Sequence, residues 1–110
     1  MKILLLEDDL ILNEIIQEHL IEKEHSVISV FTGDDAQDAI YSKTFDILLL
    51  DVNVPNINGF ELLNQLRKNG IKTPAIFITS ANMLEDIEKG FESGCDDYIK
   101  KPFELKELDL

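Results

Sequence analysis

Short apolar runs alternate along the chain with longer segments in which apolar residues recur at helical spacing. Three runs are apolar throughout, which is typical of strands buried on both faces of a parallel sheet: 3–6, 47–50 and 75–78. Two weaker runs, 27–30 and 98–99, bring the predicted strands to five. The strict alternation of strands and helices predicts a doubly wound α/β domain with right-handed crossovers and helices on both faces of the sheet.

The first two predicted helices each have a capping residue and one apolar stripe. We expect Asp9 to cap the first helix, and Asp34 or Asp35 to cap the second, which begins after Gly33. The buried stripes are Leu12, Ile15, Ile16 and Leu20 in the first helix and Ala36, Ala39 and Ile40 in the second.

Three more helices are predicted. Asn58 caps the third, which stops near Asn69 and Gly70, and Asn82 caps the fourth, with Glu85 at capping-box spacing, before it ends at Gly94. Their inward residues are Phe60, Leu63 and Leu66 in the third helix and Leu84, Ile87 and Phe91 in the fourth. A fifth helix follows Pro102 and has only about two turns before the chain ends, so we expect it to be truncated and the native chain to continue.

The composition fits a single soluble domain over residues 1–110. The chain is 45% hydrophobic and 29% charged, and no apolar run approaches the roughly 18 residues of a membrane span. The N-terminus lacks the pattern of a signal peptide, so we expect a cytoplasmic protein without a membrane partner. A net charge of −12 argues against a nucleic-acid surface on this domain. The one cysteine, Cys95, is expected to be a buried thiol.

Polar side chains follow four of the predicted strands. In chain order they are Glu7-Asp8-Asp9, Asp51, Thr79-Ser80 and Lys100-Lys101. Because the carboxyl ends of parallel strands meet at one edge of the sheet, acids, a hydroxyl and an ammonium should lie together there. Two carboxylates roughly 5 Å apart repel by about 3 kcal/mol at an effective dielectric near 20, which a bound divalent cation would explain. All-oxygen ligands suit Mg²⁺, or Mn²⁺ in its place.

Four stretches carry a family resemblance: LLEDD at 5–9, LDVNVPNING at 50–59, ITSA at 78–81 and YIKKPF at 98–103. Their order and spacing resemble those of bacterial response-regulator receivers over nearly the whole chain. The resemblance implies a flavodoxin-like sheet with strand order 2-1-3-4-5. It also implies a two-component function, in which the domain takes a phosphoryl group from a histidine kinase and switches its surface to control an output.

The resemblance assigns a role to each polar residue at the sheet edge. Asp51 becomes the phosphoacceptor, and Asp8, Asp51 and the backbone carbonyl of Asn53 would hold the metal, with Glu7 acting through a water molecule. Lys101 and the Thr79 hydroxyl would stabilise charge on the phosphoryl oxygens. Lys100 is expected to be solvated.

Two further residues are implicated by the same resemblance. Tyr98 would report the state of the site, because its ring can turn inward when Thr79 is drawn toward the phosphoryl group. The alternative is a static tyrosine packed by its ring alone. The bond between Lys101 and Pro102 is expected to be cis, since family receivers use that turn to aim the lysine.

The output is predicted from the segment Gly94-Cys95-Asp96-Asp97-Tyr98, which looks like that of OmpR/PhoB-type transcription regulators. It favours a winged-helix DNA-binding domain beyond residue 110, so that DNA is a partner only through that separate domain. A stand-alone receiver of the chemotaxis type is the alternative. Phosphorylation would favour a homodimer through the fourth helix, fifth strand and fifth helix, with matching residues Ile87, Lys89, Asp97 and Glu107.

Two other functions compete with the phosphorylation switch. A phosphohydrolase with an aspartyl nucleophile would carry Asp-x-Asp-x-Thr, whereas this chain has Asn53 two residues after Asp51 and no second acid there. A phosphorylation-independent interaction module would not need the full set of acids, Thr79 and Lys101. We therefore expect no conventional enzyme, but a domain that phosphorylates itself from a small phosphodonor with Mg²⁺ and slowly loses the phosphate.

Overall fold

The computed structural model describes residues 1–80, 88–89 and 91–110. It contains a five-stranded parallel sheet in the order β2-β1-β3-β4-β5, as the resemblance implied. The strands are β1 (Lys2–Leu6), β2 (Ser26–Val30), β3 (Ile47–Leu50), β4 (Ala75–Thr79) and β5 (Asp97–Lys100). The helical elements are α1 (Leu10–Glu22), α2 (Gly33–Ser42), α3 (Gly59–Lys68) and a 3₁₀ helix, η1 (Leu105–Leu108).

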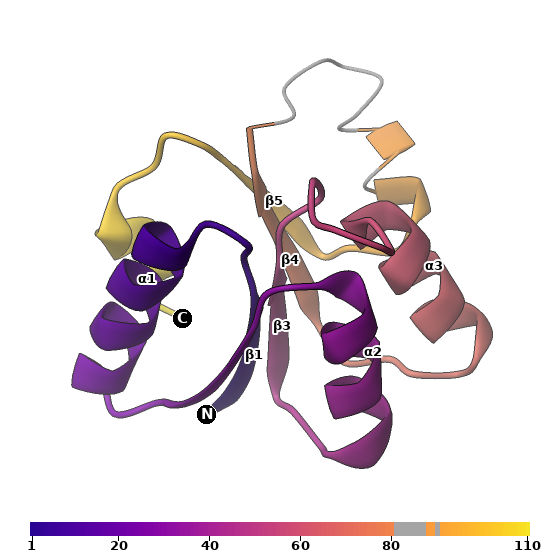
Figure 1. Cartoon of the computed structure of the whole chain (residues 1–110), viewed down its shortest axis with the longest axis horizontal. Helices are drawn as coiled ribbons and strands as arrows, with labels where there is room; N and C mark the ends of the chain where they lie inside the picture. Colours follow the sequence, from indigo (N-terminus) through magenta and orange to yellow (C-terminus); the bar gives the residue numbers. More distant parts are fainter. Residues whose placement is uncertain (81–87, 90) are drawn as a thin grey trace.

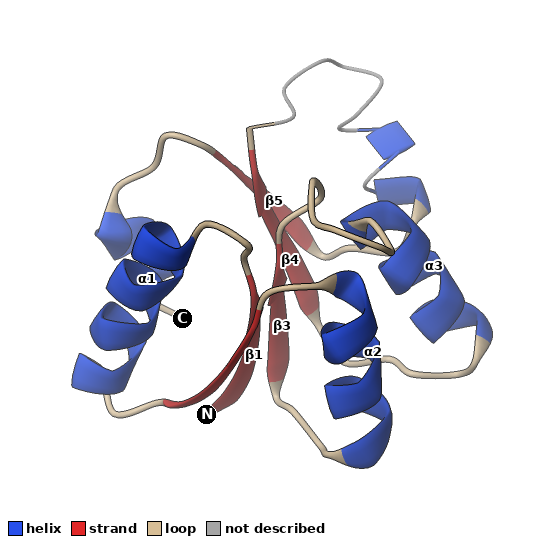
Figure 2. Cartoon of the chain, in the orientation of Figure 1, coloured by secondary structure: helices blue, strands red, loops and turns tan. Residues whose placement is uncertain are grey.

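The sheet lies between two helical layers, with α1 and η1 on one side and α2 and α3 on the other (Figures 1 and 2). Residues of β1 alternate between the layers: Leu4 and Leu6 pack with the α2 and α3 side, while Ile3 and Leu5 pack with α1 and η1. Both faces of the central strands are therefore buried, which explains why these runs are apolar throughout. No helix among the described residues is long and apolar enough to cross a membrane.

Helix caps were predicted correctly at α1 and α3 and wrongly at α2. Asp9 accepts hydrogen bonds from the amides of Ile11 and Leu12 in the first turn of α1, and Asn58 accepts one from the amide of Glu61 in the first turn of α3. At α2 the cap is Thr32, whose Oγ1 accepts from the amide of Asp35 at 3.1 Å. Gly33 is already helical, so Asp34 and Asp35 lie in the first turn, where carboxylates interact favourably with the helix dipole.

The buried face of α1 also differs from the prediction. Ile16 and Leu20 are buried and Leu12 is partly buried, but Ile15 is 43% exposed and the buried polar residue Asn13 shares the inner face. Ile15 lies about 100° around the helix from Ile16, which places it at the border of the inward stripe. Apolar residues at the border of a helical stripe are more accessible to solvent than those at its centre, which explains the exposure of Ile15.

The segment before β5 and the chain end show two more differences. Phe91, predicted to point inward, is 49% exposed, and this end of the segment buries Ser93 and Cys95 instead. The other predicted residues of the fourth helix, Asn82, Leu84, Glu85 and Ile87, lie outside the described residues. In place of the predicted fifth helix there is one short 3₁₀ helix, η1, with a capping box between Glu104 and Glu107 at its start. So few residues cannot offset the cost of helix nucleation unaided.

Cys95 is a free, buried thiol, as predicted. Burial raises its pKa to about 11, and the charges of Asp96 and Asp97 add to the effect. A thiol with so high a pKa carries almost no thiolate at neutral pH and is a poor nucleophile.

Candidate functional site: an acidic cluster at the carboxyl edge of the sheet

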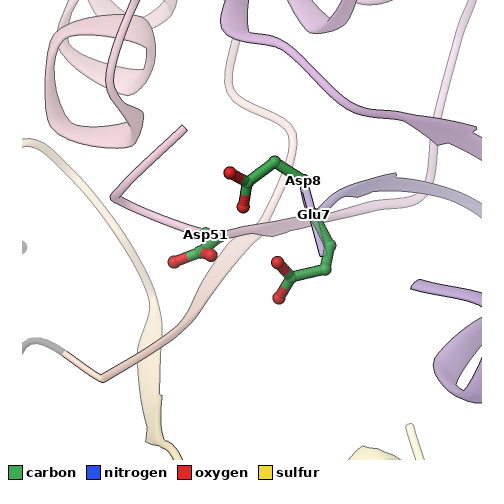
Figure 3. A group of neighbouring side chains, drawn as sticks. All are labelled: Glu7, Asp8 and Asp51. Carbon is green, nitrogen blue, oxygen red and sulfur yellow. The ribbon is translucent and has the colours of Figure 1, made fainter. Parts of the chain in front are cut away.

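Three carboxylates gather where β1 and β3 end. One ligand oxygen from each of Glu7, Asp8 and Asp51 lies within 4.8 Å of the others. Figure 3 shows the three side chains projecting from the ends of these two neighbouring strands. Glu7 and Asp51 are only 2% and 6% exposed, while Asp8 is exposed to solvent. The sequence therefore predicted correctly that these acids meet.

Backbone hydrogen bonds fix the carboxyl end of β1 between the ends of its two neighbours, β2 and β3. The amide of Asp51 donates to the carbonyl of Leu6 at 3.0 Å, and the amide of Glu7 donates to the carbonyl of Val30 at 3.2 Å. These bonds extend the parallel ladders by one residue past the strands. Glu7 and Asp51 are thus held in register on adjacent strands, which accounts for their closeness.

Lys101 lies between the two buried acids. Its Nζ is 2.5 Å from Oε1 of Glu7 and 3.2 Å from Oδ2 of Asp51, and its side chain is 19% exposed. Its backbone amide donates to the carbonyl of Thr79 at 2.9 Å, so the turn after β5 is fixed against the end of β4. The peptide bond between Lys101 and Pro102 is cis, as expected.

The burial of these charges changes their ionisation. Burial raises the pKa of Glu7 to about 7, an effect that the hydrogen bonds from Lys101 and Asp9 only partly offset. Burial alone would lower the pKa of Lys101, but the hydrogen bond to Glu7 and the charge of Asp51 outweigh it and the pKa rises. Lys101 therefore remains a cation beside the acids at neutral pH.

The loop after Asp51 comes close to the strand end. The amide of Asn53 donates to Oδ1 of Asp51 at 3.4 Å, and the amide of Gly59 donates to the carbonyl of Val52 at 2.9 Å. A Cβ at Gly59 would lie 2.5 Å from the carbonyl oxygen of Asp51, so only glycine allows this approach. The start of α3 thereby packs against the backbone of Asp51 and Val52.

Thr79 and Tyr98 come from the neighbouring strands β4 and β5. Thr79 is completely buried, and Tyr98 is partly buried with its ring at 6.2 Å and 60° from that of Phe77. Phe77 and Thr79 are two residues apart on β4 and so face the same side of the sheet. Tyr98 pairs with Phe77 in the sheet and Lys100 pairs with Thr79, so Tyr98 and Thr79 are close on adjacent strands. The role of Tyr98 as a switch stays a prediction.

The described residues among those predicted for a dimer contact groups other than the three acids. Lys89 places its Nζ 5.4 Å from the centre of the Phe60 ring, and Asp97 accepts a hydrogen bond from the amide of Tyr98. The side chain of Glu107 accepts from the amide of Glu104. Ile87 lies outside the described residues. Their part in self-association stays a prediction.

One site residue was missed from the sequence. Asn13, on α1, is 2% exposed and its Nδ2 donates to the carbonyl of Glu7 at 3.0 Å. A polar residue within an otherwise apolar helical stripe is the signal that points to it.

The donor set fits a hard divalent cation. The three grouped ligands are carboxylates, two of them buried, and carboxylate oxygens are the ligands that Mg²⁺ and Mn²⁺ prefer. The exposure of Asp8 leaves one side of the group open to solvent, which suits an ion that keeps several of its waters.

Comparison with known proteins extends the picture to the whole chain. The family model of the response regulator receiver domain matches residues 3–110. Transcriptional regulatory protein CiaR of Streptococcus pneumoniae is 42% identical over 109 residues, covering 99% of this chain and 48% of CiaR. The chain spans about half the length of the curated relatives it matches.

Solved structures agree with the fold and with the family. The receiver domain of the Francisella response regulator 1452 superimposes with a TM-score of 0.93 at 33% identity, covering 97% of this chain and 88% of that one. DrrB of Thermotoga maritima, an OmpR/PhoB homologue, gives a TM-score of 0.87 at 31% identity, covering 97% of this chain and 48% of DrrB. The chain belongs to the response regulator receiver domain family.

Proposed function

We propose that this domain is the phosphoacceptor of a two-component system and that Asp51 takes a phosphoryl group from a histidine kinase. The observation that carries the proposal is the position of Asp51. It is a buried carboxylate grouped with Glu7 and Asp8 and 3.2 Å from a lysine ammonium. Phosphoryl transfer to a carboxylate needs ligands for a divalent cation beside it and positive charge near the phosphoryl oxygens, and the other acids and Lys101 meet these two needs.

The transfer would use the chain's own groups as follows. An Asp51 carboxylate oxygen forms a bond to phosphorus while the bond from phosphorus to the donor nitrogen breaks, and the bonding electrons leave with the donor. The ammonium of Lys101 would exchange an acid partner for a phosphoryl oxygen, and the Thr79 hydroxyl would donate a hydrogen bond to another phosphoryl oxygen. Gly59 allows the start of α3 to pack closely against the backbone of Asp51.

Mg²⁺ or Mn²⁺ would be held by Asp8, Asp51 and the carbonyl of Asn53, with Glu7 acting through a water molecule. When bound, it supplies charge neutralisation between the acids and the phosphoryl oxygens. Glu7 also contacts Lys101, whose ammonium lies within ion-pair distance of both Glu7 and Asp51.

The output and partners are proposed from the relatives. The chain covers about half of CiaR, which is named as a transcriptional regulator, and about half of DrrB, an OmpR/PhoB homologue. We infer that the receiver is the N-terminal part of a cytoplasmic transcription regulator, with DNA bound by a separate domain after residue 110. Phosphorylation would turn Tyr98 inward and favour a dimer through Ile87, Lys89, Asp97 and Glu107.

The test is phosphorylation of the purified domain by acetyl phosphate, followed by intact mass. With Mg²⁺ we expect the addition of one phosphate that hydrolyses slowly. Asp51→Asn should abolish it, while the matched control Asp38→Asn, an exposed aspartate on α2, should label like wild type. Labelling of Asp51→Asn, or labelling in the presence of excess EDTA, would contradict the proposed site. A domain that never gains phosphate would support the phosphorylation-independent interaction module.

A further inference from the structure

Asn13 is a buried amide on the inner face of α1, where Ile16 and Leu20 are its buried companions. Its Nδ2 donates to the carbonyl of Glu7 at 3.0 Å, six residues earlier in the chain. A buried polar side chain costs free energy unless it is hydrogen-bonded, and here the partner is the backbone of residues 7–9, which we call the acidic turn. The bond therefore connects the first helix directly to the proposed metal site.

The acidic turn is held at its other positions as well. The amide of Glu7 donates to Val30, and Oε2 of Glu7 accepts from the amide of Asp9 at 3.1 Å. Oδ1 of Asp9 in turn accepts from the amides at the start of α1. The carbonyl of Glu7 accepts from Asn13, so the backbone groups before and after Asp8 are all hydrogen-bonded. Asp8 lies between these anchors.

We propose that Asn13 is a positioning residue that sets, through the carbonyl of Glu7, the direction in which Asp8 presents its carboxylate toward Asp51. The inference rests on the proposed function, since it concerns the metal that this site would hold. Groups that orient ligands without touching the metal commonly change its affinity 10- to 100-fold when they are removed. Asn13 does so here by fixing the backbone that carries a ligand.

A purely structural role would give a different result. If Asn13 only filled space and joined α1 to the sheet, its loss would lower the stability of the domain and leave Mg²⁺ affinity unchanged. Asn13→Leu separates the two roles, because leucine has a similar volume and no hydrogen-bond donor. The matched control is Asn69→Leu, since Nδ2 of Asn69 also donates a hydrogen bond, in this case to the hydroxyl of Tyr41, and Asn69 follows the end of α3 that lies farther along the chain from Asp51.

The experiment is calorimetric titration of the unphosphorylated domain with Mg²⁺, alongside urea unfolding of each variant. We expect Asn13→Leu to weaken Mg²⁺ binding by about 10-fold, with Asn69→Leu within twofold of wild type. Equal affinity in wild type and a folded Asn13→Leu would overturn the inference alone. A wild-type domain that binds no Mg²⁺ would overturn the proposed metal site, and the inference with it.

A second measurement needs no variant and decides the matter if Asn13→Leu does not fold. In a ¹⁵N-labelled wild-type domain, titration with Mg²⁺ should shift the side-chain amide signals of Asn13 together with the backbone signals of Asp8 and Asp51. The side-chain signals of Asn69 should stay in place. If the Asn13 signals also stay fixed while the acids respond, the side chain is not coupled to the metal site and the inference is wrong.

Discussion

The two edges of the sheet each contain an ionic cluster, and the clusters are built on opposite plans. At the carboxyl edge three carboxylates, Glu7, Asp8 and Asp51, lie together, and the ammonium of Lys101 pairs with Glu7 and Asp51. At the amino edge the only arginine of the chain, Arg67, meets a single carboxylate. The first cluster is charge-imbalanced and the second is balanced.

All three nitrogens of the Arg67 guanidinium donate hydrogen bonds to backbone carbonyls. Its guanidinium donates to the carbonyl of Gly94 through Nε and Nη2 at 3.1 and 3.0 Å, and through Nη1 to Ile71 and Thr73 at 3.0 and 2.8 Å. It lies 3.5 Å from Asp96, whose Oδ2 accepts from the amide of Ala75. This cluster, which we call the Arg67 clamp, joins the end of α3 to the segments that lead into β4 and β5.

The difference separates stability from function. Every hydrogen bond of the Arg67 clamp is made within the domain, so the clamp needs no ligand to complete it. The carboxyl edge gathers three carboxylates against one lysine, and a bound cation would relieve the repulsion among them. A fold tolerates such an arrangement where binding or chemistry uses it.

The largest expected effect lies at the carboxyl edge. Lys101→Met should slow phosphorylation by acetyl phosphate about 100-fold, since removing one group that stabilises developing charge typically costs 10²- to 10³-fold. The matched control is Lys100→Met, because Lys100 is an exposed cation next to Lys101, at the end of β5. Time courses of intact mass measure both rates. A loss below fivefold would mean that Lys101 is only a counter-ion for Glu7.

The next effect tests the amino edge. Arg67→Met should lower the free energy of unfolding by about 3 kcal/mol, because several backbone carbonyls lose a charged donor. Lys68→Met, a neighbouring exposed cation, should change it by less than about 0.5 kcal/mol. Urea unfolding followed by circular dichroism gives both values. At a temperature where Arg67→Met is folded, its phosphorylation rate should equal that of wild type. A slower rate would show that the Arg67 clamp affects function as well as stability.

The two edges also differ in how far the sequence predicts them. The acids, Thr79 and Lys101 follow apolar strands directly, and the topology of a parallel sheet brings such positions to one edge, so their meeting was predictable. The Arg67 clamp was not predicted. Its acceptors are backbone carbonyls of loops, which carry no residue-type signal, and the conformation of Gly94, with φ of +97°, is set by the assembled loop.

Local signals failed where tertiary contacts decide. Thr32, Asp34 and Asp35 are all suitable caps, and the choice among them depends on where α2 begins against the loop at Ile57. A Cβ at Gly33 would lie 1.9 Å from the carbonyl oxygen of Ile57, so that contact fixes the start of the helix. Periodicity cannot register such a contact, and although it marks Asn13 as a polar residue on an apolar face, it cannot show which carbonyl the side chain reaches.

A smaller effect measures the charge imbalance directly. Asp8→Asn should stabilise the metal-free domain by about 1 kcal/mol, because it removes one repelling charge, and the exposure of Asp8 reduces the full Coulomb energy. Added Mg²⁺ should raise the melting temperature of wild type but not of Asp8→Asn. Thermal unfolding tests both, with Asp38→Asn as the control that should change little. If neither Mg²⁺ nor the substitution stabilises the domain, the acids do not repel strongly and the contrast between the edges fails.

The smallest effect concerns exposed charges that belong to neither edge. In the proposed dimer Lys89 and Glu107 face each other across the interface, and an exposed pair contributes at most about 1 kcal/mol. Both already have partners within the domain, since Lys89 lies over Phe60 and Glu107 caps η1, and these contacts compete with pairing between subunits. Sedimentation of the full-length protein with beryllofluoride should show Lys89→Glu and Glu107→Lys each weakening the dimer up to about fivefold. The double variant should recover affinity by exchanging the charges, whereas equal dimerisation of both single variants would place the interface elsewhere.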